Sequence, residues 1–118
     1  MSVIHRSGGT DRTVAGTVER ADSWFAKGRG LMFRRSIAED YALVFEFDRV
    51  GTRRLHMICV PFPIDAAWLQ EGVIERIKRL PAWSGRGAAR ADTVIEFSAG
   101  VTEGIEAGDR LRVENREG

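Results

Sequence analysis

The sequence contains few of the residues that mark several well-known protein classes. Cys59 is the only cysteine, so no disulfide can form within the chain, which favours a reducing compartment. With two histidines and no pair of cysteines, the usual zinc site is not expected. The longest nearly uninterrupted apolar stretch, residues 57–69, contains two prolines and an aspartate. It is therefore not expected to cross a bilayer as a helix.

An excess of charge of one sign is also missing. The chain has 18 lysine and arginine residues against 17 aspartate and glutamate residues, a formal net charge of +1. A dedicated binder of nucleic acid or of a membrane surface usually carries a large basic excess. We therefore expect neither partner. Residues 1–12 contain no apolar run typical of a secretion signal, so we expect a cytoplasmic protein.

The residues that are present indicate one folded domain, residues 1–118. Hydrophobic residues make up 43% of the chain, a normal share for a globular domain of this length. Strict alternation at 41–47 predicts a strand in which Leu43, Phe45 and Phe47 face one way. Further strands are predicted at 2–6, 13–19, 55–60, 93–97 and around Leu111 and Val113, with a loop at 81–91.

The middle of the chain stays ambiguous from its residues alone. Val73, Ile77 and Leu80 fit a helical stripe, whereas the glycine at 72 fits a hairpin turn between strands 64–70 and 73–80. Periodicity slightly favours the helix. A short helix is expected after Asp22, and a single helical turn at 100–105.

Four groups of residues occur together in a recognisable order. They are Arg-Gly-Leu-Met-Phe-Arg at 29–34, Ala-Leu-Val-Phe-Glu-Phe at 42–47, Met57 followed by Pro-Ile-Asp at 63–65 and Trp68, and Val-Ile-Glu-Phe-Ser-Ala-Gly at 94–100 followed by Ile105 and Gly-Asp at 108–109. This arrangement resembles an uncharacterised family, domain of unknown function 192, over roughly residues 12–114. The resemblance implies a mostly-β fold with a short helix, favours the hairpin at 64–80, and implies no established reaction.

One segment departs from the family pattern. Many members carry Trp-Met-Lys-Asn-Thr where this chain has His-Met-Ile-Cys-Val at 56–60. A family role that depends on that lysine or amide is therefore not expected here. For the fold we expect a mainly-β, single-domain antiparallel β-sandwich or partly open barrel of about seven or eight strands with one or two short helices.

Asp65 is the strongest candidate for a functional residue. It lies among apolar neighbours, where a charge is costly unless it is paired. It is either a structural carboxylate, bound by backbone N–H groups or an arginine such as Arg29, or a carboxylate that faces a ligand. Glu46 and Glu96 lie in strands whose residues alternate between two faces, and their side chains are expected in solvent.

Weaker candidates precede Asp65 in the sequence. Arg29, with Arg34 and Arg35, flanks a glycine-rich turn that could bind an anion, although a solvated cluster is the simpler interpretation. His56 and Cys59 would lie on opposite faces of a strand, which argues against a catalytic dyad. Met32, Met57 and Cys59 offer sulfur atoms suited to Cu(I), but core packing is simpler. No catalytic residue, metal or cofactor is predicted.

The leading hypothesis is a non-catalytic module that binds a small ligand or a protein segment near Asp65, His56, Met32 and Arg29. One alternative is a small hydrolase that uses Asp65 with Glu96 or His56. Another is an oligomeric interaction domain with Trp24 or Trp83 in an exposed apolar patch. The sequence specifies neither the ligand nor the oligomeric state.

Overall fold

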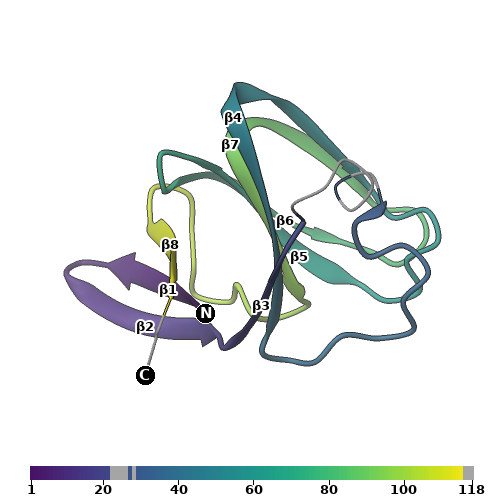
Figure 1. Ribbon diagram of the computed structural model, residues 1–118, viewed down its shortest axis with the longest axis horizontal. Helices are drawn as coiled ribbons and strands as arrows, with labels where there is room; N and C mark the ends of the chain where they lie inside the picture. The colour runs from purple at the N-terminus through teal and green to yellow at the C-terminus, as the bar shows by residue number, and fades with distance from the viewer. Residues whose placement is uncertain (22–26, 28, 116–118) are drawn as a thin grey trace.

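Eight strands form one curled sheet in the computed structural model, which describes residues 1–21, 27 and 29–115 (Figure 1). The order in the sheet is β2-β1-β8-β6-β5-β7-β4-β3. The strands are β1 (Ser2–Ser7), β2 (Thr10–Ala15), β3 (Thr17–Arg20), β4 (Tyr41–His56), β5 (Ile64–Gln70), β6 (Val73–Leu80), β7 (Arg86–Ser98) and β8 (Arg110–Glu114). The mainly-β expectation is confirmed.

Two details differ from the expected architecture. The pairing between β3 and β4 is parallel, whereas all other neighbours are antiparallel. The strands form one sheet rather than two layers, so the partly open barrel describes it better than the sandwich. The helix expected after Asp22 lies outside the described residues. No helix among the described residues is long and apolar enough to cross a membrane.

Both faces of the central strands are buried. The loop-covered face carries Leu43, Phe45 and Trp68, which pack beneath the segments around Leu31 and Val60. The enclosed face carries side chains that meet β1, β2 and β8 as the sheet curls, among them Val44, Ala67, Leu69, Ile95 and Phe97. Burial of both faces explains why six of the seven residues of β5 are buried.

The alternation at 41–47 produces the predicted faces. Tyr41, Leu43 and Phe45 belong to the loop-covered face, and Ala42 and Val44 to the enclosed face. The hairpin at 64–80 is also confirmed, with Glu71 and Gly72 at positive φ in its two-residue turn. The helical stripe was misleading because its residues do not share one face. Ile77, with Ile74, packs against the enclosed face, whereas Leu80 belongs to the loop-covered face.

The ribbon of β4 and β7 is longer than predicted. β4 continues past an irregular register between Glu46 and Gly51 and ends at His56, paired with Arg86. The predicted strand at 55–60 is therefore wrong beyond His56, where residues 57–60 form a turn closed by Val60 N–H donating to Met57 O at 3.0 Å. The predicted loop at 81–91 is wrong from Arg86 onward, because this stretch pairs with the extension of β4.

The distal half of the ribbon bends over the loop-covered face (Figure 1). Here the edge of β7 that does not face β4 receives side chains from β5 and β6. Gln70 donates a hydrogen bond to the Arg90 carbonyl at 3.0 Å. Arg76 donates to the Ala88 carbonyl and Lys78 to the Arg86 carbonyl, both at 2.8 Å. Carbonyls of alternate residues point to one edge of a strand, so these three side chains cap a free edge.

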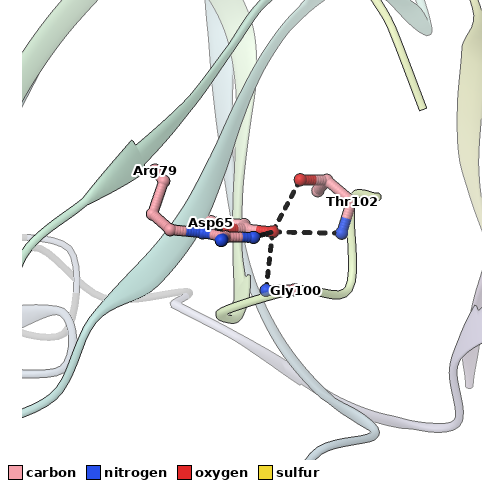
Figure 2. A network of polar contacts seen from close by, with 4 residues as sticks. All are labelled: Asp65, Arg79, Gly100 and Thr102. Carbon is pink, nitrogen blue, oxygen red and sulfur yellow. Dashed lines mark hydrogen bonds and ion pairs between the residues drawn. The ribbon is translucent and has the colours of Figure 1, made fainter. Parts of the chain in front are cut away.

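Asp65 joins β5 to the loop that follows β7 (Figure 2). Its side chain is only 1% exposed, and Oδ2 accepts hydrogen bonds from the N–H groups of Gly100 and Thr102 at 2.9 and 3.1 Å and from Thr102 Oγ1 at 2.6 Å. Arg79, directly opposite on β6, donates to Oδ1 at 2.8 Å. The predicted burial and bonding are confirmed, with Arg79 rather than Arg29 as the arginine. Although burial raises the pKa of Asp65, the bonds from Arg79, Thr102 and Gly100 outweigh it and hold the pKa below its usual value.

Replacing Asp65 should destabilise the fold in a pH-dependent way. Asp65→Asn keeps the shape but loses the charge that Arg79 and the loop donors require, so we expect a loss of about 1–3 kcal/mol in urea unfolding at neutral pH. Because the folded-state pKa is lowered, the difference from the natural protein should shrink as the pH falls below 3.8. Asp11→Asn, at an exposed ion pair with Arg112, is the control and should not shift the midpoint. An unchanged midpoint for Asp65→Asn would contradict this role.

Candidate functional site

A pocket of about 360 Å³ opens beneath the bent ribbon. It lies between the distal part of β4, Lys27 with residues 29–32, and the loop-covered face of β7. Its apolar wall is formed by Leu31, Met32, Phe45, Phe47, Val60 and Val94. Pockets of this size that combine an apolar wall with a few polar groups are typical binding sites for small molecules.

The pocket brings together three of the four residues predicted for a site. Arg29, Met32 and His56 all line it, whereas Asp65 does not. In the pairing of β5 with β7, Asp65 is the partner of Phe97, and Glu96 is the partner of Ala66. Because neighbouring residues of a strand face opposite sides, Asp65 and Glu96 lie on opposite faces of the sheet. The carboxylate pair considered for acid–base chemistry therefore does not form.

Glu96 supplies the carboxyl group of the pocket. The expectation that it is solvated is wrong, because the residue is only 5% exposed. Burial raises its pKa from 4.5 to about 7, and the charge of Arg34 lowers it only in part. None of the described residues contributes a hydrogen bond to this shift. The sequence did hold a signal, since Glu96 lies between Ile95 and Phe97 just as Asp65 lies between apolar neighbours.

Gly30 allows the chain to pass close to Glu96. Its φ of +51° is in the left-handed region, and a Cβ built there would lie 3.5 Å from Glu96 Oε1 and 3.5 Å from Phe45 Cζ. The turn around it is closed by Met32 N–H donating to Arg29 O at 3.0 Å. The turn at 29–32 therefore forms one wall of the pocket and covers the buried carboxyl group.

The mouth of the pocket is cationic. Lys27, Arg29, Arg53 and Arg54 line it together with His56. The Arg53 guanidinium lies 3.8 Å from the centroid of the Phe47 ring and donates to the carbonyls of Ala91 and Arg49, so its position is fixed. Positive groups around an apolar wall suit a molecule with an apolar body and an anionic group.

Cys59 and His56 do not have the arrangement predicted from the sequence, in which both lie on one strand. Cys59 lies in a turn with φ of +60° rather than on a strand, so the argument from opposite strand faces does not apply. His56 Nδ1 instead accepts a hydrogen bond from Ile58 N–H at 3.3 Å. Among the described residues, no group of three or more His, Cys, Asp or Glu side chains is arranged to hold a metal ion.

Comparison with known proteins matches the sequence of this chain to one family. The model of DUF192, described as "Uncharacterized ACR", matches residues 3–113. A search of the curated proteins finds no similar sequence.

Two solved structures share the fold. A protein from Sinorhizobium meliloti 1021, described as a candidate transcription regulator, superposes with a TM-score of 0.82 at 26% identity, over 93% of this chain and 90% of that chain. A protein of unknown function from Novosphingobium aromaticivorans DSM 12444 also gives a TM-score of 0.82, at 18% identity, over 95% of this chain and 84% of that chain.

The burial of Glu96 predicts how stability depends on pH. Its folded-state pKa of about 7 exceeds the unfolded value of 4.5, so the natural protein should lose stability as the pH rises between these values. The total loss is on the order of 3 kcal/mol. Glu96→Gln stays neutral, so it should equal the natural protein below pH 4.5 and exceed it above pH 7 in urea titrations.

The exposed Glu75 of β6 provides the matched control for this measurement. Glu75→Gln should leave the pH dependence of the urea midpoint as it is in the natural protein. Parallel curves for Glu96→Gln and the natural protein over the whole range would show that Glu96 is not held neutral by burial.

Proposed function

The chain belongs to the family domain of unknown function 192, and we propose that this member is a non-catalytic module that binds a small molecule in the pocket lined by Arg29, Met32 and His56. One observation carries the proposal: a single pocket combines an apolar wall, a cationic mouth and one buried carboxyl group. The family itself has no known function, so the chemistry of the pocket is the basis for the choice of ligand.

The ligand class follows from the charges. A carboxylate or phosphate group would meet the guanidinium groups at the mouth, and an apolar body would cover Met32 and Phe45. Glu96 would help only in its protonated form, because a neutral carboxyl group donates a hydrogen bond whereas an ionised one repels an anion. Affinity for the anion should therefore fall as the pH rises through about 7.

The position of Asp65 supports binding rather than catalysis. Its carboxylate faces away from the pocket and is occupied by Arg79, Gly100 and Thr102, so it offers no second acid or base there. One observation still favours the hydrolase alternative, now with Glu96 and His56: an acid whose pKa is near neutrality lines the same pocket as a histidine. Trp24, named for the oligomeric alternative, lies outside the described residues.

Thermal-shift measurements test the proposal with four small probes that share a phenyl ring and differ in charge. Phenylacetate and phenyl phosphate should raise the melting temperature, because they bind only the folded state. Phenylethanol lacks the anionic group and benzylamine carries the opposite charge, so neither should raise it. The shift caused by phenylacetate should decrease above pH 7 as Glu96 ionises.

A blocked pocket provides the specificity control. Thr52 is exposed and lines the pocket, so Thr52→Trp should fill the entrance without disturbing the core, and should abolish the shift. Thr13→Trp, at an exposed position of β2 outside the pocket, should bind as the natural protein does. Equal shifts with anionic and uncharged probes, or binding by Thr52→Trp, would contradict the proposal. Hydrolysis of para-nitrophenyl acetate that disappears in Glu96→Gln would favour the enzyme instead.

A further inference from the structure

Three turns expose large apolar side chains at one end of the molecule. Phe33, Ile58 and Trp83 are 68, 58 and 62% exposed, and the only other exposed large hydrophobic among the described residues is Met1. The turns lie side by side, because Phe33 N–H donates to Cys59 O at 2.8 Å and Trp83 N–H donates to Val60 O at 3.0 Å. We call Phe33, Ile58 and Trp83 the apolar tip. The three turns that carry it lie at the end away from β1, β2 and β8 (Figure 1).

The backbone of these turns is costly for the residues that occupy them. Phe33 and Trp83 have φ values of +70° and +67°, in the left-handed region that bulky residues rarely adopt. A glycine or asparagine would adopt the same conformation more easily. Because both side chains project into solvent, neither gains core packing that would offset the strain. Residues strained and exposed in this way are characteristic of binding surfaces.

The segments that supply the three turns are rich in basic residues, and acidic residues such as Asp48 and Asp92 lie directly beside these segments in the sequence. Segments 27–38, 49–64 and 76–91 supply the three turns and contain four, three and five of the 18 lysine and arginine residues, but none of the 17 aspartate and glutamate residues. Glu19 and Asp65 reach arginines of these segments as ion-pair partners, and Glu96 is buried. The net charge of +1 thus conceals a cationic end.

Several exposed arginines of these segments are available to a partner. Arg29, Arg35, Arg54 and Arg86 are exposed. Their guanidinium groups form none of the ion pairs found among the described residues. The apolar tip is therefore accompanied by unpaired positive charge, which attracts a partner that is both anionic and able to cover apolar side chains.

We propose that the apolar tip docks on an anionic membrane surface. Tryptophan and phenylalanine prefer the boundary between lipid headgroups and acyl chains, and arginine binds the anionic headgroups above them. Side chains that project from three separate turns can be surrounded by lipid, which deforms around them. A second copy of the chain would bring like charges together, and Ile58 offers no ring on which a nucleic-acid base could stack.

Co-sedimentation with vesicles tests this proposal. The full chain should bind vesicles of phosphatidylcholine mixed with phosphatidylglycerol, should not bind vesicles of phosphatidylcholine alone, and should be released by added salt. Phe33→Asn and Trp83→Asn keep a residue that tolerates positive φ, so both should fold, which a thermal melt would verify. Each should reduce the partition coefficient about tenfold or more, because one large apolar side chain no longer enters the lipid. Ile58→Ser should act likewise.

Charge variants distinguish the effect of the cationic end on vesicle binding from the effect of net charge. Arg35→Gln with Arg86→Gln should weaken vesicle binding, whereas Arg12→Gln with Arg110→Gln, exposed on β2 and β8, removes the same charge and should have little effect. Thr52→Trp should bind vesicles normally, so failure of the pocket proposal would leave this one intact.

Three outcomes would overturn the proposal. The first is vesicle binding that Trp83→Asn leaves unchanged, or no binding at all. The second is binding of a single-stranded oligonucleotide, in place of vesicles, that Trp83→Asn weakens, which would assign the tip to nucleic acid. The third is a concentration-dependent dimer in sedimentation equilibrium that Trp83→Asn dissociates, which would assign it to a second copy of the chain.

Discussion

The capped edge of β7 is the constraint on which the pocket depends. A strand that leaves its sheet exposes a row of unpaired carbonyl groups, which is costly inside a protein and invites pairing with other chains in solvent. Gln70, Arg76 and Lys78 satisfy three of these carbonyls with side-chain donors. The ribbon can therefore bend away from β5 and pass over the sheet, and the space beneath the bend is the pocket. Trp68 strengthens the arrangement, since its indole N–H donates to the Arg53 carbonyl at 2.9 Å.

Two carboxyl groups of the central strands show how strongly the environment of a buried carboxyl group decides its pKa. Asp65 and Glu96 are both almost fully buried, and both lie between apolar neighbours in the sequence. Asp65 meets an arginine, a hydroxyl group and two backbone N–H groups, so it is held as an anion. Glu96 lies beside Gly30, and no hydrogen bond among the described residues offsets its burial, so its pKa rises to about 7. The first carboxyl group is bonded within the fold, and the second lines the pocket.

Local patterns predicted the parts of this structure that depend on local sequence. The alternation at 41–47 identified both faces of β4, and the apolar setting of Asp65 identified a buried, bonded carboxylate. The misassigned segments, 55–60 and 81–91, depend on pairing between β4 and β7, whose partners are about 30 or more residues apart. Glu96 was assigned to solvent for the same reason: the segment that covers it comes from the other half of the chain, so its alternation carried no information about burial. The resemblance to a family, rather than periodicity, resolved the hairpin at 64–80.

The sheet is completed by its first and last strands, with Ser2 opposite Glu114 and a hydrogen bond from the buried His5 ring to Asp109 at 2.9 Å. This pairing has a consequence for the order of folding. Contacts between residues so far apart in the sequence carry a large loop-closure entropy, and domains rich in them fold slowly. The hairpin of β5 and β6 closes a two-residue turn and can form early, whereas β1 cannot find its place until β8 is present. On a ribosome, the enclosed apolar face would stay open to solvent until β8 emerged.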